Sequence, residues 1–318
     1  MTKLKILAVC AMPTDPTSWY RAWGVYGDIM KRSDIEFDCY EDLQKVSWKH
    51  LIKYDLVIFQ RALGNATQLA EYVTQLGIPY VYDLDDNFWE IPSHSSIKST
   101  YNPKVLGTME KMMKGATAIT VSTKALGDYI ENKFSIKCNV INNGIDLNKY
   151  KIQPYNQSGK TIWRGSSTHI DDVRQFANFY ESVAKQVNQI EFWGHDCVQG
   201  LPKLDIKNSK YFAGEDLVRY FRLLQTSNIA HILCTLVDDE FNRAKSNIAW
   251  IEATLAGGVC VGNGVGEFAD KQISMTDFDI KNDYQVNYIL SKQLIHERYN
   301  LSNLNDMRIE LYKKVVGK

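Results

Sequence analysis

The sequence predicts an α/β protein made of two doubly wound, Rossmann-like domains that face each other across a cleft. Short apolar runs rich in β-branched residues alternate with longer amphipathic segments, and this rhythm occurs in both halves of the chain. A polar, turn-rich segment separates the two halves. With 318 residues, 45% of them hydrophobic, the chain is long enough for two domains that each have a core.

The first half contains five apolar runs that are typical of buried parallel strands. Longer segments with helical periodicity separate them, which is the pattern of successive βαβ units. The predicted strands are Leu4–Cys10, Leu56–Gln60, Ile78–Tyr82, Ala118–Val121 and Cys138–Ile141. We therefore predict an N-terminal domain over residues 1–150.

The second half repeats this pattern and predicts a C-terminal domain over residues 151–300. A linker is expected at Asn148 to Lys160, and residues 301–318 predict a helix that could close either domain, including by packing back on the N-terminal one. The predicted strands are Thr161–Trp163, Ile190–Trp193, Ile229–Leu233 and Val259–Gly262, and the predicted helices include His169–Gln186 and Arg243–Ala256.

Charge and cysteine content exclude several classes of protein. Thirty-seven basic and thirty-seven acidic residues cancel, so no overall field attracts the chain to nucleic acid or to an anionic membrane. The six cysteines lie far apart without a CxxC pair, as expected of reduced thiols. No apolar run reaches the roughly 18 residues that a membrane-spanning helix needs. We therefore expect a cytoplasmic protein.

The segment from Phe241 to Cys260 carries the strongest functional signal. It joins a cationic loop, a helix with one acid and a glycine turn that enters a strand. On a helix that starts near Arg243, Lys245 and Glu252 are seven residues apart and project from nearly the same face. Lys245 and the helix amides attract phosphate, while Glu252 can accept from the two hydroxyls of a ribose. The alternative is an ordinary amphipathic helix with a solvated polar face.

Polar residues also follow the predicted strands, where ligands bind in open α/β sheets. In the first half these are Pro13 to Arg21, Gln60-Arg61, the tract Asp83 to Asn87, and Ser122-Thr123. In the second half they are Arg164 to Ser167, Gly194 to Asp196, and Asp238 to Ser246. We expect them to line one cleft.

Four stretches resemble the GT-B glycosyltransferases, in particular the retaining family 4, or group 1, type. They are Val140–Asp146, Trp163–Gly165, Phe192–Gly194 and Ile251–Val261, and they occur in the family's order. Two positions differ from the family pattern. Ala244 stands eight residues before Glu252, where the family often has an acid, and no lysine follows Arg164 within five residues.

The resemblance implies transfer of a sugar from a nucleotide-diphosphate sugar such as a UDP-sugar to an acceptor hydroxyl. It implies retention of anomeric configuration, no bound metal and no separate cofactor. The N-terminal domain is then expected to bind the acceptor and the C-terminal domain the donor. Catalytic roles fall to Arg164 and Lys245, which stabilise the leaving diphosphate, and to Asp85 on the acceptor side. The expected donor-binding residues are Gly165, Ser166, Gly194, His195, Asn242, Ser246 and Glu252.

The aspartate tract has three interpretations. Asp83, Asp85 and Asp86 could hold a divalent metal, or Asp85 or Asp86 could orient or deprotonate an acceptor hydroxyl. An aspartate before Asn87 could instead cap a helix. Arg21 and Arg61 are further candidates, and Arg61 needs a buried partner if it does not face the cleft.

Alternative functions remain open from the sequence. One is a catalytically silent module that binds the nucleotide sugar, for which Ala244 is the best support; another is an epimerase or phosphorylase of the same fold. A nicotinamide oxidoreductase is not expected, because Ala11-Met12-Pro13 follows the first strand in place of GxGxxG.

The acceptor is a glycan, a lipid-linked cell-envelope molecule or, as in compact phage enzymes, a hydroxymethylated pyrimidine in DNA. For DNA the sequence offers Lys98, Lys104, Lys111 and Lys114 around Tyr101.

Overall fold

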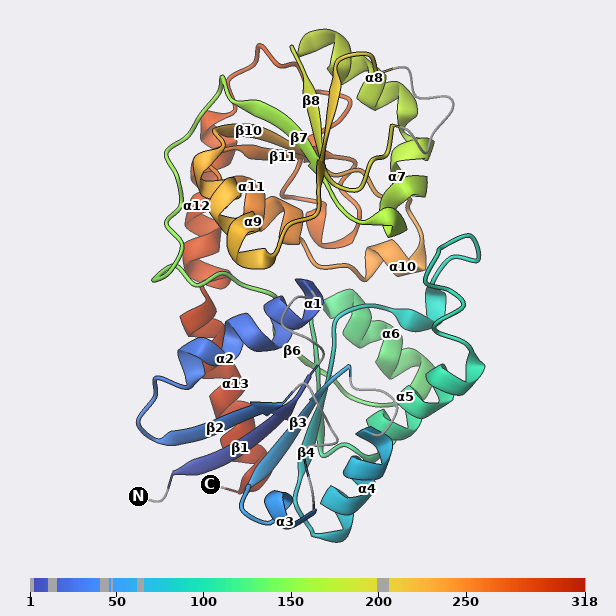
Figure 1. The fold of residues 1–318 in the computed structure, drawn as a ribbon, viewed down its shortest axis with the longest axis vertical. Coiled ribbons are helices and arrows are strands. Elements are labelled where there is room, and N and C mark those ends of the chain that lie inside the picture. The colour runs from blue at the N-terminus through green and yellow to red at the C-terminus, as the bar shows by residue number, and fades with distance from the viewer. Residues whose placement is uncertain are drawn as a thin grey trace. The chain divides into compact units, whose positions relative to one another are not determined.

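The computed structural model describes residues 3–10, 16–40, 46, 48–61, 66–198 and 206–317. The chain divides into two compact units. Unit 1 consists of Met1–Ile91, Lys98–Asp146 and Asn300–Lys318, and unit 2 of Pro92–Ile97 and Leu147–Tyr299. Each unit contains one six-stranded parallel sheet with helices against it (Figure 1). The predicted α/β class with two doubly wound sheets is confirmed.

The sheet of unit 1 has the strand order β2-β1-β3-β4-β5-β6. Strand β2 was not predicted, because Ile35, Phe37 and Cys39 alternate with polar residues and form no continuous apolar run. Strand β4 lies two residues later than predicted, since Gly77 has a φ of 69° and Pro79 has no backbone N–H to donate. The strands are β1 Leu4–Val9, β2 Ile35–Tyr40, β3 Leu56–Gln60, β4 Tyr80–Leu84, β5 Ala118–Val121 and β6 Asn139–Val140.

Local sequence signals set the ends of the longer helices of unit 1. Asn102 accepts from the backbone N–H groups of residues 104 and 105 at the start of α5, and Thr123 caps α6 in the same way. Ser135, in the left-handed region, ends α6. The helices are α1 Pro16–Ser18, α2 Gly24–Ile29 after the π-turn η1 Trp19–Trp23, α3 Trp48–Leu51, α4 Ala66–Gln75, α5 Pro103–Gly115, α6 Lys124–Phe134 and α13 Leu301–Val316, with a 3-10 turn η3 at Phe88–Glu90.

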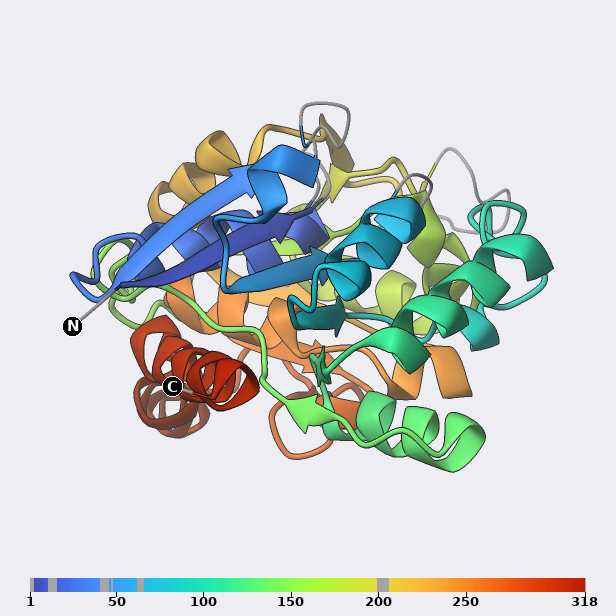
Figure 2. The ribbon, with the colours of Figure 1, turned by 90° about the horizontal axis from the view of Figure 1, so that it is seen from below.

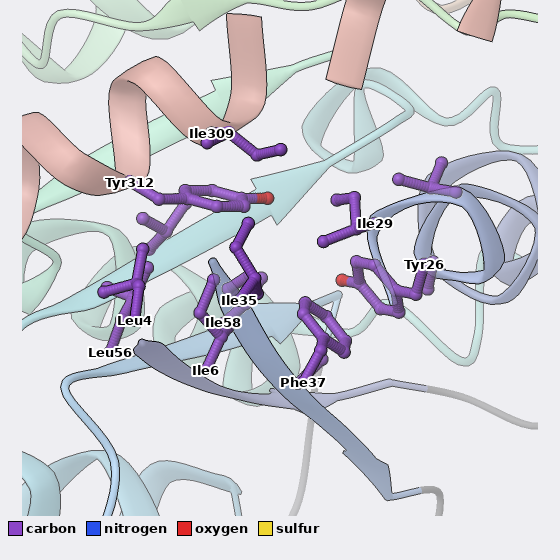
Figure 3. Packing of buried hydrophobic residues seen from close by; sticks show 14 of the residues in the cluster. Leu4, Ile6, Tyr26, Ile29, Ile35, Phe37, Leu56, Ile58, Ile309 and Tyr312 are labelled. Carbon is purple, nitrogen blue, oxygen red and sulfur yellow. The ribbon is translucent and has the colours of Figure 1, made fainter. Parts of the chain in front are cut away.

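Helix α13 packs on unit 1 although it comes from the other end of the chain. Its Ile309 and Tyr312 face Leu4 and Leu56 of the sheet in one buried apolar cluster (Figure 3). Figure 2 shows α13, in red, beside the dark-blue N-terminal strands. The core of unit 1 is therefore completed by the last residues of the chain.

The sheet of unit 2 has the strand order β12-β11-β10-β7-β8-β9. The four predicted strands are confirmed, while the edge strands β9 and β12 were not predicted because they are short or largely exposed. The strands are β7 Lys160–Arg164, β8 Ile190–Gly194, β9 Ser209–Ala213, β10 Ile229–Leu233, β11 Val259–Gly262 and β12 Ile273–Ser274. The helices are α7 Ile170–Gln175, α8 Ala177–Gln186, α9 Leu217–Thr226, α10 Glu240–Arg243, α11 Ile248–Leu255 and α12 Gln285–Arg298, with 3-10 turns η4 Ser167–His169 and η5 Gly266–Phe268.

Both long helices predicted for unit 2 are interrupted. The first breaks at Phe176, whose φ of −106° and ψ of 27° are not helical. The second is wrong as a single helix, because Ala244 to Asn247 separate α10 from α11. Lys245 N–H bonds to the Asn242 carbonyl in a turn, and Asn247 has a ψ of 35°. Lys245 and Glu252 therefore do not project from one helix face.

The segment predicted as a linker packs on unit 2. Tyr150 stacks on Phe221 with ring centroids 4.6 Å apart, and the N–H groups of Gln153 and Asn156 bond to the carbonyls of Leu255 and Gly257. Among the described residues, no helix is long and apolar enough to cross a membrane.

Candidate functional site

The strand order of unit 2 fixes where its ligand crevice lies. From β7 the sheet runs to β8 on one side and to β10 on the other, so the direction of the winding changes between β7 and β10. In open α/β sheets, ligands bind at this switch point, outside the carboxyl ends of the strands. Arg164 is the last residue of β7, and Cys234 and Thr235 directly follow β10. The candidate site is built around these residues.

An ion pair joins two of the predicted site residues. Arg164 Nε lies 2.6 Å from Glu252 Oε2, and the hydroxyl of Tyr220 on α9 donates to the same oxygen at 2.7 Å. The Glu252 side chain is only 3% exposed, so its charge needs these partners. Burial, followed by the charge of Glu252, raises the pKa of Tyr220 well above its ordinary value and keeps it a donor.

The second predicted cation belongs to the same site. Lys245, in the turn before α11, places its ammonium 4.3 Å from the centre of the Phe241 ring. Lys245 and Arg164 both act electrostatically on two common neighbours, His169 and Cys234. The pKa of Cys234 is lowered, first by a hydrogen bond from Cys260 and then by these positive charges. The tertiary structure thus brings Arg164 and Lys245 to one site, although Lys245 does not share the helix predicted for it with Glu252.

Asp172, which the sequence reasoning missed, organises the loops around the site. Its carboxylate lies 2.7 Å from His169 Nδ1 and accepts from the Val237 N–H at 2.7 Å and from the Asn242 amide at 3.0 Å. Asn242 also donates to the Val237 carbonyl. One buried carboxylate thereby ties the loop after β7 to the loop after β10. The signal in the sequence was an acid in the first turn of the helix that follows Arg164.

Two glycines let the loops after β7 and β8 approach each other. Gly194 has a φ of 101°, and a Cβ atom at this residue would lie 2.4 Å from the Gly165 carbonyl oxygen. Gly165 N–H in turn bonds to the Trp193 carbonyl at 3.0 Å. The backbone of these loops is therefore held at a spacing that a side chain would prevent.

The remaining predicted donor-site residues lie on the same loops. Ser166 accepts from the Thr168 N–H and also contacts the Thr168 hydroxyl, so it caps the turn η4. His195 lies in the bend after β8, and Ser246 precedes α11; both are partly exposed. All the donor-site residues that we predicted are in unit 2.

Unit 1 places the aspartate tract at the carboxyl end of β4, where the three aspartates have different environments. Asp83 forms a buried, two-point ion pair with Arg21, with N–O distances of 2.9 and 2.6 Å. Arg21 also donates to the Ile141 carbonyl and to Asn143. Asp83 and Arg21 thus hold the core of unit 1 together, and this pairing does not fit the metal-binding interpretation of Asp83.

Among the three aspartates, Asp85 is the best candidate for a group that exchanges a proton. Burial raises its pKa to about 7, in opposition to Arg61, whose guanidinium lies 3.8 Å away. Its Oδ1 and both polar atoms of the Asn87 side chain are buried without a hydrogen-bond partner among the described residues. The N-cap residue of the turn η3 is Asn87 and not an aspartate, and the Asn87 side chain makes no capping hydrogen bond.

The described residues give little support for a metal site or for a DNA-binding surface. No group of three His, Cys, Asp or Glu residues there could hold a metal ion. Two lysines of the proposed DNA-tracking set pair with acids: Lys111 with Glu71 and Lys114 with Glu110, both at 2.6 Å.

Neither a protein-family model nor a curated protein matches the sequence. Solved structures do match it over nearly its whole length. Sucrose-phosphate synthase from Thermosynechococcus elongatus superposes with a TM-score of 0.67 at 10% identity, covering 98% of this chain and 99% of that one. The Anabaena protein HepE in complex with UDP and glucose gives 0.65 at 14% identity, covering 98% and 100%.

The chain has the GT-B fold. The same fold relates it to UDP-GlcNAc 2-epimerase from Neisseria meningitidis bound to UDP-GlcNAc, with a TM-score of 0.52, 12% identity and coverage of 98% and 100%. At these identities the likeness establishes the architecture. The activity has to be argued from the residues of the site.

Proposed function

We propose that the protein is a glycosyltransferase that moves a sugar from a nucleoside-diphosphate sugar, with UDP as the first candidate, to an acceptor hydroxyl. The observation that supports this most is the common position of Arg164, Lys245 and Glu252 at the switch point of unit 2 in a GT-B fold. Two cations beside one buried carboxylate suit a ligand that joins a diphosphate to a ribose.

The proposed chemistry follows the charges that develop during transfer. Positive charge grows at the anomeric carbon, and negative charge grows on the leaving diphosphate. Arg164 and Lys245 stabilise the diphosphate, with backbone N–H groups of Gly165 and Ser246 as further donors. Glu252 accepts from the ribose hydroxyls, and Tyr220 keeps its carboxylate oriented. The proposal includes retention of anomeric configuration without a metal ion.

On the acceptor side, Asp85 is proposed to accept the proton of the attacking hydroxyl. A carboxylate whose pKa is raised to about 7 is a stronger base than an ordinary aspartate, and about half of it is ionised at neutral pH. We propose a glycan or lipid-linked acceptor. DNA is the second choice, because Lys111 and Lys114 already have acidic partners.

Substitution of the two cations tests the donor site. Arg164→Ala and Lys245→Ala should each reduce turnover by about 10²-fold or more, the effect typical of a lost transition-state donor. Release of nucleoside diphosphate, followed by mass spectrometry, measures this for each sugar nucleotide identified in a thermal-shift screen of uridine, guanosine and cytidine donors. Arg219→Ala is the matched control, since Arg219 is exposed on α9 and paired with Glu215. Unchanged donor hydrolysis in both site variants would refute the assignment.

Glu252→Ala should chiefly weaken nucleotide affinity, which calorimetry measures. Binding as tight as in the unmodified protein would remove the ribose role.

A sugar-nucleotide epimerase is the second candidate, because the fold is shared with the Neisseria UDP-GlcNAc 2-epimerase. An epimerase would produce an isomer of the sugar nucleotide or of the free sugar. A transferase would produce a new glycoside and free nucleoside diphosphate. Product analysis by NMR separates the two and also reports the anomeric configuration. Binding with no product of either kind would indicate a silent module, and loss of activity with EDTA would contradict metal independence.

A further inference from the structure

His169 has a fixed orientation at the edge of the candidate donor site. It ends the turn η4 after β7, with its side chain 24% exposed and its Nδ1 atom 2.7 Å from Asp172 Oδ2. Asp172 is itself held by the Val237 N–H and the Asn242 amide. The imidazole ring is therefore anchored through one nitrogen and accessible from outside.

The partner on Nδ1 determines the state of the other nitrogen. An ionised carboxylate can only accept hydrogen bonds, so the proton of the neutral ring is on Nδ1. Nε2 then carries a lone pair and becomes a hydrogen-bond donor only if the ring takes up a second proton. A neutral His169 thus offers nothing to a phosphate oxygen, while a protonated one offers a charged donor.

Three charged groups act on this ring, each from a different element. Asp172 on α7 favours the protonated form, whereas Lys245 before α11 and Arg164 at the end of β7 oppose it. Burial is the largest influence and, together with the two cations, lowers the pKa of His169 below its ordinary value. In the unliganded protein the ring is therefore neutral at physiological pH.

We propose that His169 takes up a proton when a diphosphate binds beside Arg164 and Lys245, and that it becomes a third cation on the phosphates. The inference rests on the donor site proposed above. A bound diphosphate neutralises the two cations that repel the second proton, while Asp172 continues to attract it. The proton comes from solvent and returns to it when the nucleotide leaves, and no covalent bond other than N–H changes. The protonated Nε2 donates a charge-assisted hydrogen bond to a phosphate oxygen.

This coupling makes donor affinity depend on pH with a defined sign. The pKa of His169 is lowered in the free protein and higher in the complex, so protons favour binding. Affinity should increase as the pH falls from above the bound pKa towards the free pKa, by up to about tenfold per pH unit in that window.

Calorimetry on the 318-residue chain tests the proposal directly. UDP-glucose is the first probe, because both its phosphates are esterified and do not titrate near neutral pH. Titrations at one pH in buffers of different ionisation enthalpy give the number of protons taken up. We expect uptake of up to one proton by the unmodified protein, no uptake by His169→Gln, and an affinity for this variant that is nearly independent of pH. His296→Asn, at an exposed position on α12, is the control and should behave like the unmodified protein.

An NMR titration of the histidine Cε1 protons supplies a readout that does not depend on a variant. The His169 signal, assigned by its loss in His169→Gln, should titrate at a higher pH with UDP-glucose than without it. A merely structural role, in which His169 pins the loop through Asp172, predicts no such movement and no proton uptake.

The possible failures are distinguishable. Binding of UDP-glucose without proton uptake, or equal uptake by His169→Gln, would overturn the role of His169 and leave the donor site standing. If no uridine, guanosine or cytidine diphosphate sugar binds, the proposed function fails and the role of His169 with it.

Discussion

Burial separates the roles of charged residues that look alike in the sequence. Asp83 and Asp85 are two positions apart, and both are nearly inaccessible to water. Asp83 receives two hydrogen bonds from Arg21, whereas Asp85 has a guanidinium 3.8 Å away and one buried oxygen that has no hydrogen bond to any residue that the structure describes. A carboxylate that is paired in this way stabilises the core. A buried carboxylate with weaker partners has a raised pKa and can exchange a proton near neutral pH.

Asp85 gives a prediction with opposite effects on activity and stability. The pKa of Asp85 is raised from an ordinary value of 3.8 to about 7, so the folded state binds the proton more tightly than the unfolded state. The free energy of unfolding therefore decreases as the pH rises from about 4 towards 7. Asp85→Asn should therefore be more stable than the unmodified protein at pH 8, as measured by urea unfolding, while transfer activity is lost. The activity of the unmodified protein should fall as the pH drops through about 7. An active Asp85→Asn variant would exclude a role as base.

The Arg21–Asp83 pair gives a second residue-scale prediction. Arg21→Met leaves a buried carboxylate without its partner and should lower the free energy of unfolding by about 3–5 kcal/mol. Lys111→Met is the matched control, because its ion pair with Glu71 is exposed on both sides and should contribute far less. Similar urea midpoints for both variants would show that Arg21 is not structural.

At the scale of elements, the candidate donor site depends on where strands and helices stop. Arg164 ends β7, Gly194 ends β8, and Lys245 lies in the break between α10 and α11. Because of this break, the direction of the Lys245 side chain is not set by the helical repeat of α11. The close approach of Gly165 to Gly194 sets the distance between the loops after β7 and β8. Helix and strand ends thus position the groups that the proposed chemistry uses.

Gly194→Ala tests this arrangement. The new methyl group would lie 2.4 Å from the Gly165 carbonyl oxygen at a φ of 101°, so the loops must separate. We expect affinity for UDP-glucose to fall by about tenfold or more and stability to fall by about 1–3 kcal/mol. Gly107→Ala is the control: this glycine lies on an exposed face of α5 with nothing within 4 Å, and alanine should stabilise the helix by up to about 1 kcal/mol. Unchanged binding by Gly194→Ala would mean that the loop spacing does not matter.

At the scale of the whole molecule, the two units differ in how the chain builds them. The sheet of unit 2 comes from one continuous stretch, while unit 1 needs α13 from the end of the chain to cover its apolar cluster. Unit 1 can therefore complete its core only after unit 2 has been synthesised.

Paired substitutions on α13 test this dependence. Ile309→Ala removes a buried side chain from the cluster and should lower the free energy of unfolding of unit 1 by about 2–5 kcal/mol. Met307→Ala, on the same helix but 48% exposed, should change it by about 0.5 kcal/mol or less. Both variants should bind UDP-glucose like the unmodified protein at temperatures where unit 1 is folded, since the proposed donor residues lie in unit 2. Equal unfolding midpoints in urea would contradict the packing of α13.

The sequence by itself determined the α/β class, nine of the twelve strands found in the described part of the chain, and the loops that hold the predicted donor residues. Periodicity could do this because a strand buried on both faces must be apolar along its whole length. It missed β2, β9 and β12, which lie at or near the sheet edges and are partly exposed.

Only the tertiary structure decided which charges meet. The pairing of Arg164 with Glu252 and the bonds of Asp172 to His169 and Val237 follow from the sheet order, which places β10 beside β7 although β8 and β9 intervene in the chain. Sequence spacing reports neighbours within one element, whereas strand order brings distant loops together. The lysine and glutamate seven residues apart led to the candidate site through a helix that the structure does not form.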